Sequence, residues 1–313
     1  MYLKMITKQK YGLVILLLST LLIVSCEGPD LIQPVGFETA VEADSIIFAQ
    51  IGDFGYAGTA EGDVAKLVDS WKPDFIISVG DNNYSEGLSS TLKSNISNYY
   101  GDYIYNYDAS PGFRCNGKAF EDQINRFFPT PGNHDANNRD GLVPYYNFFT
   151  LPHNEIYYKF SWGPVTFYSI NALENNLEEQ KAWLEQELTL SSSPFNIVFS
   201  HYPPYSSGVH GNIDLVRWDY YNMGVDVMFT GHDHIYERTE RVGEEGMYYI
   251  VNGLGGRAAN DCVGGLSPEL FNSLCFGGDY GAVKCTATLN KLILEFYAVS
   301  SPGQPIDRIE ITK

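Results

Sequence analysis

Short apolar runs alternate with amphipathic stretches along most of the chain after residue 44. Apolar residues at helical spacing predict one helix that ends before Pro73, one over 177–190 and one over 212–223. Runs rich in β-branched and aromatic residues predict five buried strands, over 45–51, 75–79, 127–130, 195–200 and 225–230. The pattern is therefore typical of an α/β protein.

The remaining segments favour strands. Residues 157–170 predict a β-hairpin that turns at Trp162 and Gly163. In the C-terminal third, strands are expected near 247–251, 282–289, 291–298 and 306–311, and no helical pattern separates the last three.

The first residues follow another pattern. Lys4, Lys8 and Lys10 precede an apolar run over 13–24, which is short for a membrane span and is typical of a signal peptide. The run leads into Cys26 through Leu-Ile-Val-Ser, which resembles a bacterial lipoprotein processing site with that cysteine as the lipidated first residue. An uncleaved N-terminal anchor is the alternative.

These features divide the chain into three parts. Residues 1–25 are expected to be a lipoprotein signal peptide, and 26–44 a flexible tether, because this stretch has no periodicity and contains two prolines. Residues 45–313 are expected to form the functional domain, in the bacterial cell envelope and facing the periplasm or the cell surface.

The chain is acidic, with 38 acidic and 20 basic side chains and a net charge of −18 over 313 residues. It has no basic stripe, which argues against nucleic acid as a partner. An acidic surface also repels phosphate esters, so an anionic ligand would need a local source of positive charge.

Four cysteines follow Cys26, and an even number in an exported protein suggests disulfides. Cys115, Cys262, Cys275 and Cys285 allow three pairings, and Cys262 with Cys275 is favoured because these two flank a loop.

Each of the five predicted strands ends in a short loop that carries aspartate, asparagine or histidine. Sites in open α/β sheets form at the carboxyl ends of the strands, so these side chains are expected to meet. Carboxylate, amide and imidazole groups suit hard to borderline metal ions. The loops have the following sequences: Gly-Asp-Phe-Gly at 52–55, Gly-Asp-Asn-Asn-Tyr at 80–84, Gly-Asn-His-Asp at 132–135, Val-Phe-Ser-His at 198–201 and Gly-His-Asp-His at 231–234.

Together these motifs resemble the metallophosphoesterase superfamily, and specifically the small purple acid phosphatases of the tartrate-resistant acid phosphatase type. The resemblance spans nearly all of residues 45–312, and one departure is Ser200, where close relatives have glycine. It implies a calcineurin-like metallophosphoesterase fold, a four-layer α/β/β/α sandwich of two mixed β-sheets flanked by helices.

The resemblance also implies a metal centre. Seven side chains would hold two ions: Asp53, Tyr84 and His234 the first, Asn133, His201 and His232 the second, and Asp81 both.

Tyr84 distinguishes among the subfamilies of this superfamily. Other metallophosphoesterases usually have histidine two residues after the first aspartate, where this chain has Gly55, so the tyrosine would replace that ligand. A phenol has a pKa of about 10, so its binding as phenolate at acidic pH needs a strongly polarising ion. We therefore expect Fe(III) with a divalent partner, which could be Fe, Zn or Mn.

Two further histidines match family residues that face the phosphate group. His134 follows the asparagine ligand, and His210 lies in a glycine-containing loop; either could protonate the leaving group. The alternatives are a structural partner of Asp81 or of the backbone for His134, and a surface loop residue for His210.

The expected function is an acid phosphatase that hydrolyses phosphate monoesters by direct attack of a metal-bound hydroxide. Its partner would be a small phosphate ester, its contact with the membrane would be only through lipidated Cys26, and it would be a monomer. A phosphodiesterase or nucleotidase on the same fold is the nearest alternative. A catalytically silent, lipid-anchored surface binding protein is an alternative from another class.

Overall fold

A computed structural model describes residues 40–263 and 269–313, which contain two mixed β-sheets packed face to face. The first sheet consists, in spatial order, of β1 (Ala40–Val41), β5 (Tyr158–Trp162), β6 (Val165–Ser169), β7 (Phe195–Phe199), β8 (Val227–Thr230), β10 (Tyr248–Asn252), β9 (Tyr236–Arg241) and β11 (Leu270–Phe276). The second consists of β14 (Asp307–Thr312), β13 (Lys291–Ala298), β12 (Gly281–Thr288), β2 (Ser45–Ile51), β3 (Phe75–Ser78) and β4 (Phe127–Pro129).

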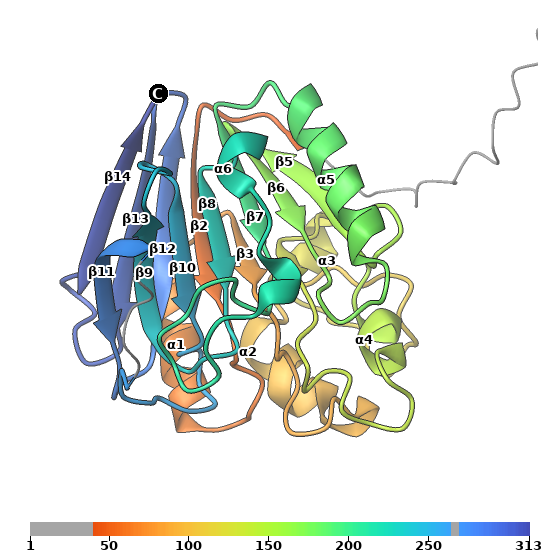
Figure 1. The fold of residues 1–313 in the computed structure, drawn as a ribbon. Helices are drawn as coiled ribbons and strands as arrows, with labels where there is room; N and C mark the ends of the chain where they lie inside the picture. The colour runs from red at the N-terminus through yellow and green to blue at the C-terminus, as the bar shows by residue number, and fades with distance from the viewer. Residues whose placement is uncertain (1–39, 264–268) are drawn as a thin grey trace, which may run out of the picture. The chain divides into compact units, whose positions relative to one another are not determined.

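Helices cover the outer faces of the sheets (Figure 1). The described helices are α1 (Thr59–Ser70), α2 (Asn98–Tyr100), α3 (Lys118–Asp122), α4 (Val143–Phe148), α5 (Leu177–Leu190) and α6 (Tyr220–Met223). Short 3₁₀ turns occur at Ser89–Thr91 and Asp214–Val216, and a π-helical turn occurs at Lys93–Ser97.

The alternation of side chains along a strand produces the layers. On β7, Ile197 and Phe199 point into the core between the sheets, whereas Val198 points outward and packs in a second core with Leu184 and Leu188 of α5. The second sheet meets the first through aromatic rings, and helix α1 packs against β12 on the other side. The four-layer α/β/β/α sandwich expected from the sequence is therefore confirmed.

Most strands lie where the apolar pattern predicts them, and the expected hairpin forms as β5 and β6. The helix predicted over 212–223 is wrong: only Asp214–Val216 and Tyr220–Met223 are helical there. The reason is local, because the Asp219 carboxylate accepts a hydrogen bond from the Asn222 N–H and starts a new helix.

Strand β9 was not predicted, because its sequence Tyr-Glu-Arg-Thr-Glu-Arg reads as polar. Its charges are nevertheless buried with partners. Arg238 Nε lies 2.6 Å from Asp307 Oδ2, and the Glu237 carboxylate accepts two hydrogen bonds from Ser207. A polar strand can thus be internal when each of its charges is paired.

Strand β1 pairs with β5 in parallel, so residues 40 and 41 of the expected tether belong to the first sheet. The expected signal peptide and Cys26 lie outside the described residues. Among the residues that are described, no helix is long and apolar enough to cross a membrane. The expected disulfide between Cys262 and Cys275 is present, and Cys115 and Cys285 are buried as free thiols.

Candidate metal centre

The five motif loops all follow parallel strands. β2, β3 and β4 run parallel in one sheet, and β7 and β8 run parallel in the other. Their carboxyl ends therefore release the loops at one edge of each sheet, and the side chains of those loops converge. Asp53, Asp81 and His201, all buried, place ligand atoms within 4.8 Å of one another.

One group of donors contains the first three expected ligands. The Tyr84 hydroxyl lies 3.2 Å from Asp53 Oδ1 and 3.3 Å from His234 Nε2. Asp53 Oδ1 and His234 Nε2 are 3.5 Å apart. The spacing of a phenol, a carboxylate and an imidazole around one point suits a single cation.

A second group lies beside it. His201 Nε2 is 3.0 Å from Asn133 Oδ1, and the His232 ring centroid lies 5.1 Å from that of His201. The carboxylate of Asp81 lies between the two groups. Its Oδ2 accepts a hydrogen bond from Tyr84 at 2.7 Å, and its Oδ1 is 3.5 Å from His201 Nε2.

The structure thus brings together all seven side chains expected from the sequence. The donor set fits two hard or borderline cations, because each oxygen of Asp81 faces a different group. Without positive charge between them, the buried carboxylates of Asp53 and Asp81 would repel each other.

Unusual backbone geometry aims three of the candidate ligands. Asp53, Asp81 and His232 have φ values of 54°, 51° and 70°, in the left-handed region that non-glycine residues rarely adopt. Hydrogen bonds hold these turns: the Asp53 N–H donates to the Gly80 carbonyl at 2.9 Å, and the His232 N–H donates to Asp53 Oδ2 at 3.0 Å. Asp53 and His232 are therefore tied to each other across the two sheets.

Asp135, the last residue of the third motif, connects two loops. Its buried carboxylate accepts hydrogen bonds from the Gly132 N–H at 2.8 Å and from the Asn82 side chain at 2.9 Å. Burial, and then the charge of Asp81, raise the pKa of Asp135 to about 7. Asp135 thus joins the loop that carries Asn133 to the loop that carries Asp81.

The electrostatics of the protein alone favour a neutral phenol at Tyr84 and a neutral imidazole at His232. Burial, and then the charges of Asp53 and Asp81, raise the pKa of Tyr84 well above its ordinary value. Burial, and then the charge of His201, lower the pKa of His232 to about 3, so this ring is neutral and can offer a lone pair. Burial alone would lower the pKa of His234, but the hydrogen bond and charge of Asp53 raise it.

The two expected catalytic histidines lie beside different donor groups: His134 is next to Tyr84, and His210 is next to His232. His134 is fixed by its Nδ1, 2.7 Å from the Ser85 carbonyl oxygen, and its ring packs 4.4 Å from that of Tyr84. His210 is exposed, and its ring centroid lies 4.3 Å from that of His232. Both imidazoles therefore border the donor groups.

Two carboxylates beyond the expected set hold the loop that carries His210. Asp233, between the histidines of the last motif, is fully buried and accepts hydrogen bonds from the Ser206 hydroxyl at 2.6 Å and from the His210 N–H at 2.9 Å. Glu237 accepts from the N–H and the hydroxyl of Ser207. Nothing in the sequence pattern links Asp233 to residues 206–210.

Arg257 was also not identified from the sequence. Its backbone N–H donates to the Asp53 carbonyl oxygen at 3.0 Å, and its guanidinium carbon lies 5.4 Å from the centre of the Tyr84 ring. Arg257 therefore places a positive charge beside Tyr84, at the border of the candidate metal centre.

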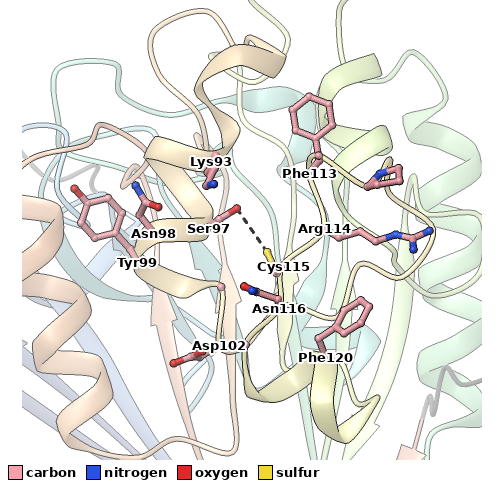
Figure 2. A pocket seen from close by; sticks show the side chains of 14 residues that line it. Lys93, Ser97, Asn98, Tyr99, Asp102, Phe113, Arg114, Cys115, Asn116 and Phe120 are labelled. Carbon is pink, nitrogen blue, oxygen red and sulfur yellow. Dashed lines mark hydrogen bonds between the residues drawn. The ribbon is translucent and has the colours of Figure 1, made fainter.

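A cavity of about 760 Å³ lies elsewhere, between residues 93–102 and 111–120, and no candidate ligand lines it (Figure 2). The Cys115 thiol in its wall donates a hydrogen bond to the Ser97 hydroxyl, and burial raises the pKa of that thiol. The cavity is therefore separate from the convergent donors.

Comparison with known proteins agrees with the geometry. The calcineurin-like phosphoesterase family model matches residues 46–236, which include all seven candidate ligands. Purple acid phosphatase 15 of Arabidopsis thaliana is 26% identical over 239 residues, which are 66% of this chain and 44% of that protein. The Fe(3+)-Zn(2+) purple acid phosphatase 12 of the same plant is 42% identical over 85 residues, 24% of this chain and 18% of that protein.

A solved structure has the same fold. The purple acid phosphatase from yellow lupin (Lupinus luteus) seeds superposes with a TM-score of 0.67 at 20% identity, over 87% of this chain and 54% of that one. The chain spans about half or less of the length of these relatives.

Proposed function

Because the chain belongs to the calcineurin-like phosphoesterase family, we propose that it is an acid phosphatase of the purple acid phosphatase type, which hydrolyses phosphate monoesters at two metal ions. The observation that carries the proposal is the carboxylate of Asp81, whose two oxygens face two separate groups of donors. One of these groups contains the phenol of Tyr84.

The proposed ions are Fe(III) with a divalent partner, Fe, Zn or Mn. A phenol between two carboxylates keeps its proton unless a strongly polarising ion binds it, so Tyr84 favours a trivalent ion at the first position. The name of one similar protein, an Fe(3+)-Zn(2+) purple acid phosphatase, supports the same pair.

When bound, the two cations would polarise the phosphoryl group and activate a water molecule for in-line attack on phosphorus. The chain's own residues orient the ester and supply the proton. His134, held by the Ser85 carbonyl oxygen, would hydrogen-bond the phosphoryl group. His210, whose ring lies beside that of His232, would donate a proton to the leaving oxygen.

Metal analysis combined with a visible absorption spectrum tests the assignment of the ions. We expect iron in the purified protein and a broad visible band from tyrosinate-to-Fe(III) charge transfer, which Tyr84→Phe should remove without unfolding the protein. A colourless, iron-free enzyme that still hydrolyses esters would contradict the role of Tyr84 and favour a Mn or Zn phosphoesterase.

A comparison of 4-nitrophenyl phosphate with bis(4-nitrophenyl) phosphate tests the class of ester. We expect the higher kcat/KM for the monoester. A higher value for the bis-ester would favour the phosphodiesterase alternative, and the absence of both metal and hydrolysis would favour the silent binding protein.

The cellular setting is proposed from sequence alone. The pattern of residues 1–26 supports a lipid anchor at Cys26 outside the cytoplasm, and the acidic composition argues against nucleic acid as a partner. Cell fractionation of a Cys26→Ser variant tests the anchor, since the variant should leave the membrane fraction. Size-exclusion chromatography tests the expected monomer.

A further inference from the structure

The loop that carries His210 is attached to the metal-ligand segment through one side chain. Asp233 has no exposed surface, and its two carboxylate oxygens accept different donors. Oδ1 accepts from the His210 N–H at 2.9 Å, and Oδ2 accepts from the Ser206 hydroxyl at 2.6 Å. The same hydroxyl accepts a hydrogen bond from the Gly208 N–H at 3.0 Å.

The packing around this carboxylate leaves little freedom. A Cβ atom at Gly208 would collide with Cγ and Oδ1 of Asp233, so the loop backbone lies directly against the side chain. Glu237, two residues into the sequence of β9, holds Ser207 by two further hydrogen bonds of 2.7 and 2.6 Å. Hydrogen bonds therefore fix this loop at Ser206, Ser207 and His210, although the side chains of Val209 and His210 are exposed.

Asp233 lies in sequence between two candidate ligands, His232 and His234. Residues 232–234 thus place one candidate ligand in each donor group. Through Asp233, the same segment also positions the imidazole of His210. The ring centroid of His210 lies 4.3 Å from that of His232. A shift of the backbone of residues 206–210 would move the His210 imidazole away from this position. A proton donor displaced by about 1 Å loses much of its effect on the reaction.

We propose that Asp233 is a positioning residue that holds His210 where it protonates the leaving oxygen, and that Gly208 is required so that the loop can reach this carboxylate. The inference rests on the proposed phosphatase function. Both carboxylate oxygens of Asp233 are engaged by the loop, so its side chain is not one of the candidate ligands. It acts through the hydrogen bond to the His210 N–H, and Glu237 supports the loop from its other side.

Dependence on the leaving group provides the test. 4-Nitrophenolate leaves without much help from an acid, whereas glycerol leaves from glycerol 2-phosphate only when its oxygen is protonated. Asp233→Asn, which replaces one acceptor oxygen by an amide donor, should lower kcat about 10- to 100-fold for glycerol 2-phosphate and by less than about 3-fold for 4-nitrophenyl phosphate. Bound metal and the visible spectrum should stay unchanged.

Gly208→Ala breaks the same contact from the loop side and leaves the metal-ligand segment intact. It should show the same selective loss, and the double variant with Asp233→Asn should lose little more than either single variant, because both act on one interaction. Val209→Ala is the matched control, since this side chain is 60% exposed in the same loop. It should leave the kcat of both esters unchanged.

The outcomes separate the possible failures. Equal loss for both esters in Asp233→Asn, with reduced metal content, would mean that the residue supports the metal ligands and would overturn the inference. Additive losses in the double variant, or unchanged kinetics in Gly208→Ala, would overturn it as well. A wild-type protein that hydrolyses neither ester would instead refute the proposed function on which the inference depends.

Discussion

Glycine residues allow the backbone to approach the candidate ligands closely. At Gly132, an added Cβ would collide with the amide nitrogen and Oδ1 of Asp81, the carboxylate that faces both donor groups. At Gly231, it would collide with Oδ2 of Asp53. The small size of these residues therefore determines the geometry of the centre as directly as the ligands do.

We expect Gly132→Ala to displace Asp81 and to reduce the metal content below one ion per chain, with a loss of activity of about 100-fold or more, comparable to removal of a key electrostatic group. Gly112→Ala is the control, because a Cβ there meets nothing within 4 Å. Metal-to-protein ratio and kcat of the two purified variants check the prediction. Normal metal content in Gly132→Ala would show that the loop moves to accommodate the methyl group.

Among the site residues, those that bind through their own side chains could be predicted from the sequence, and those that act through others could not. Asp53, Asp81 and the histidines stand in short motifs at strand ends. Asp233 is also in such a motif, but its partners Ser206 and His210 come from another loop, and only folding brings them together. Arg257 lies in no motif, and its position follows from a backbone hydrogen bond to Asp53.

At the scale of elements, helix α1 carries a buried acid, Glu61, in its first turn. This side chain has no exposed surface, and burial, opposed by a hydrogen bond from the Tyr56 backbone, raises its pKa to about 9. The folded protein thus keeps a proton that the unfolded chain releases above a pH of about 4.5. Stability should therefore fall as the pH rises through the window between those two values.

We expect the free energy of unfolding to decrease by up to about 1.4 kcal/mol for each pH unit between about pH 5 and pH 9, from this residue alone. Glu61→Gln should remove that part of the slope, whereas Asp63→Asn, on the same helix and paired at the surface with Lys66, should retain it. Urea titrations at pH 5.5, 7 and 8.5 measure both. Equal slopes in wild type and Glu61→Gln would show that the carboxyl group is hydrated.

The elements themselves differ in how well the sequence predicts them. Apolar strands such as β2 and β7 are evident because most of their residues are apolar and buried. Strand β9 is hidden because its buried charges are neutralised by residues distant in sequence, as Arg238 is by Asp307. The helix expected over 212–223 failed because Asp219, which looks like an ordinary surface residue, caps a separate turn.

At the scale of the whole molecule, the disulfide between Cys262 and Cys275 closes a loop whose ends are 13 residues apart. Reduction should lower the free energy of unfolding by about 3 kcal/mol, the value typical of a loop of this size. Urea unfolding with and without a phosphine reductant measures the change. A Cys262→Ser, Cys275→Ser double variant should show the lower stability in both conditions; a further loss on reduction would point to another disulfide.

Metal removal should also act on the whole fold. Asp53 and Asn133 belong to loops of one sheet, and His201 and His234 to loops of the other, so each donor group joins both sheets. Chelation should lower the Tm, because ions that bind only the folded protein stabilise it by mass action. Differential scanning calorimetry of the chelated and reloaded protein measures this. An unchanged Tm with proven loss of metal would contradict the bridging arrangement.

The position of β2 in its sheet has a consequence for the order in which the protein is made. This strand lies between β3 and β12, and the register pairs Ser45 with Thr288. A nascent chain therefore presents Asp53 early, on a strand that lacks one neighbour until residues 281–288 of β12 have also been synthesised. The strand that carries Asp53 is therefore enclosed in its sheet only after β12 has paired with it. If the proposed ions bind, we expect them to bind a sheet completed in this way, so that the metal supply at the place of folding would influence which ions are bound.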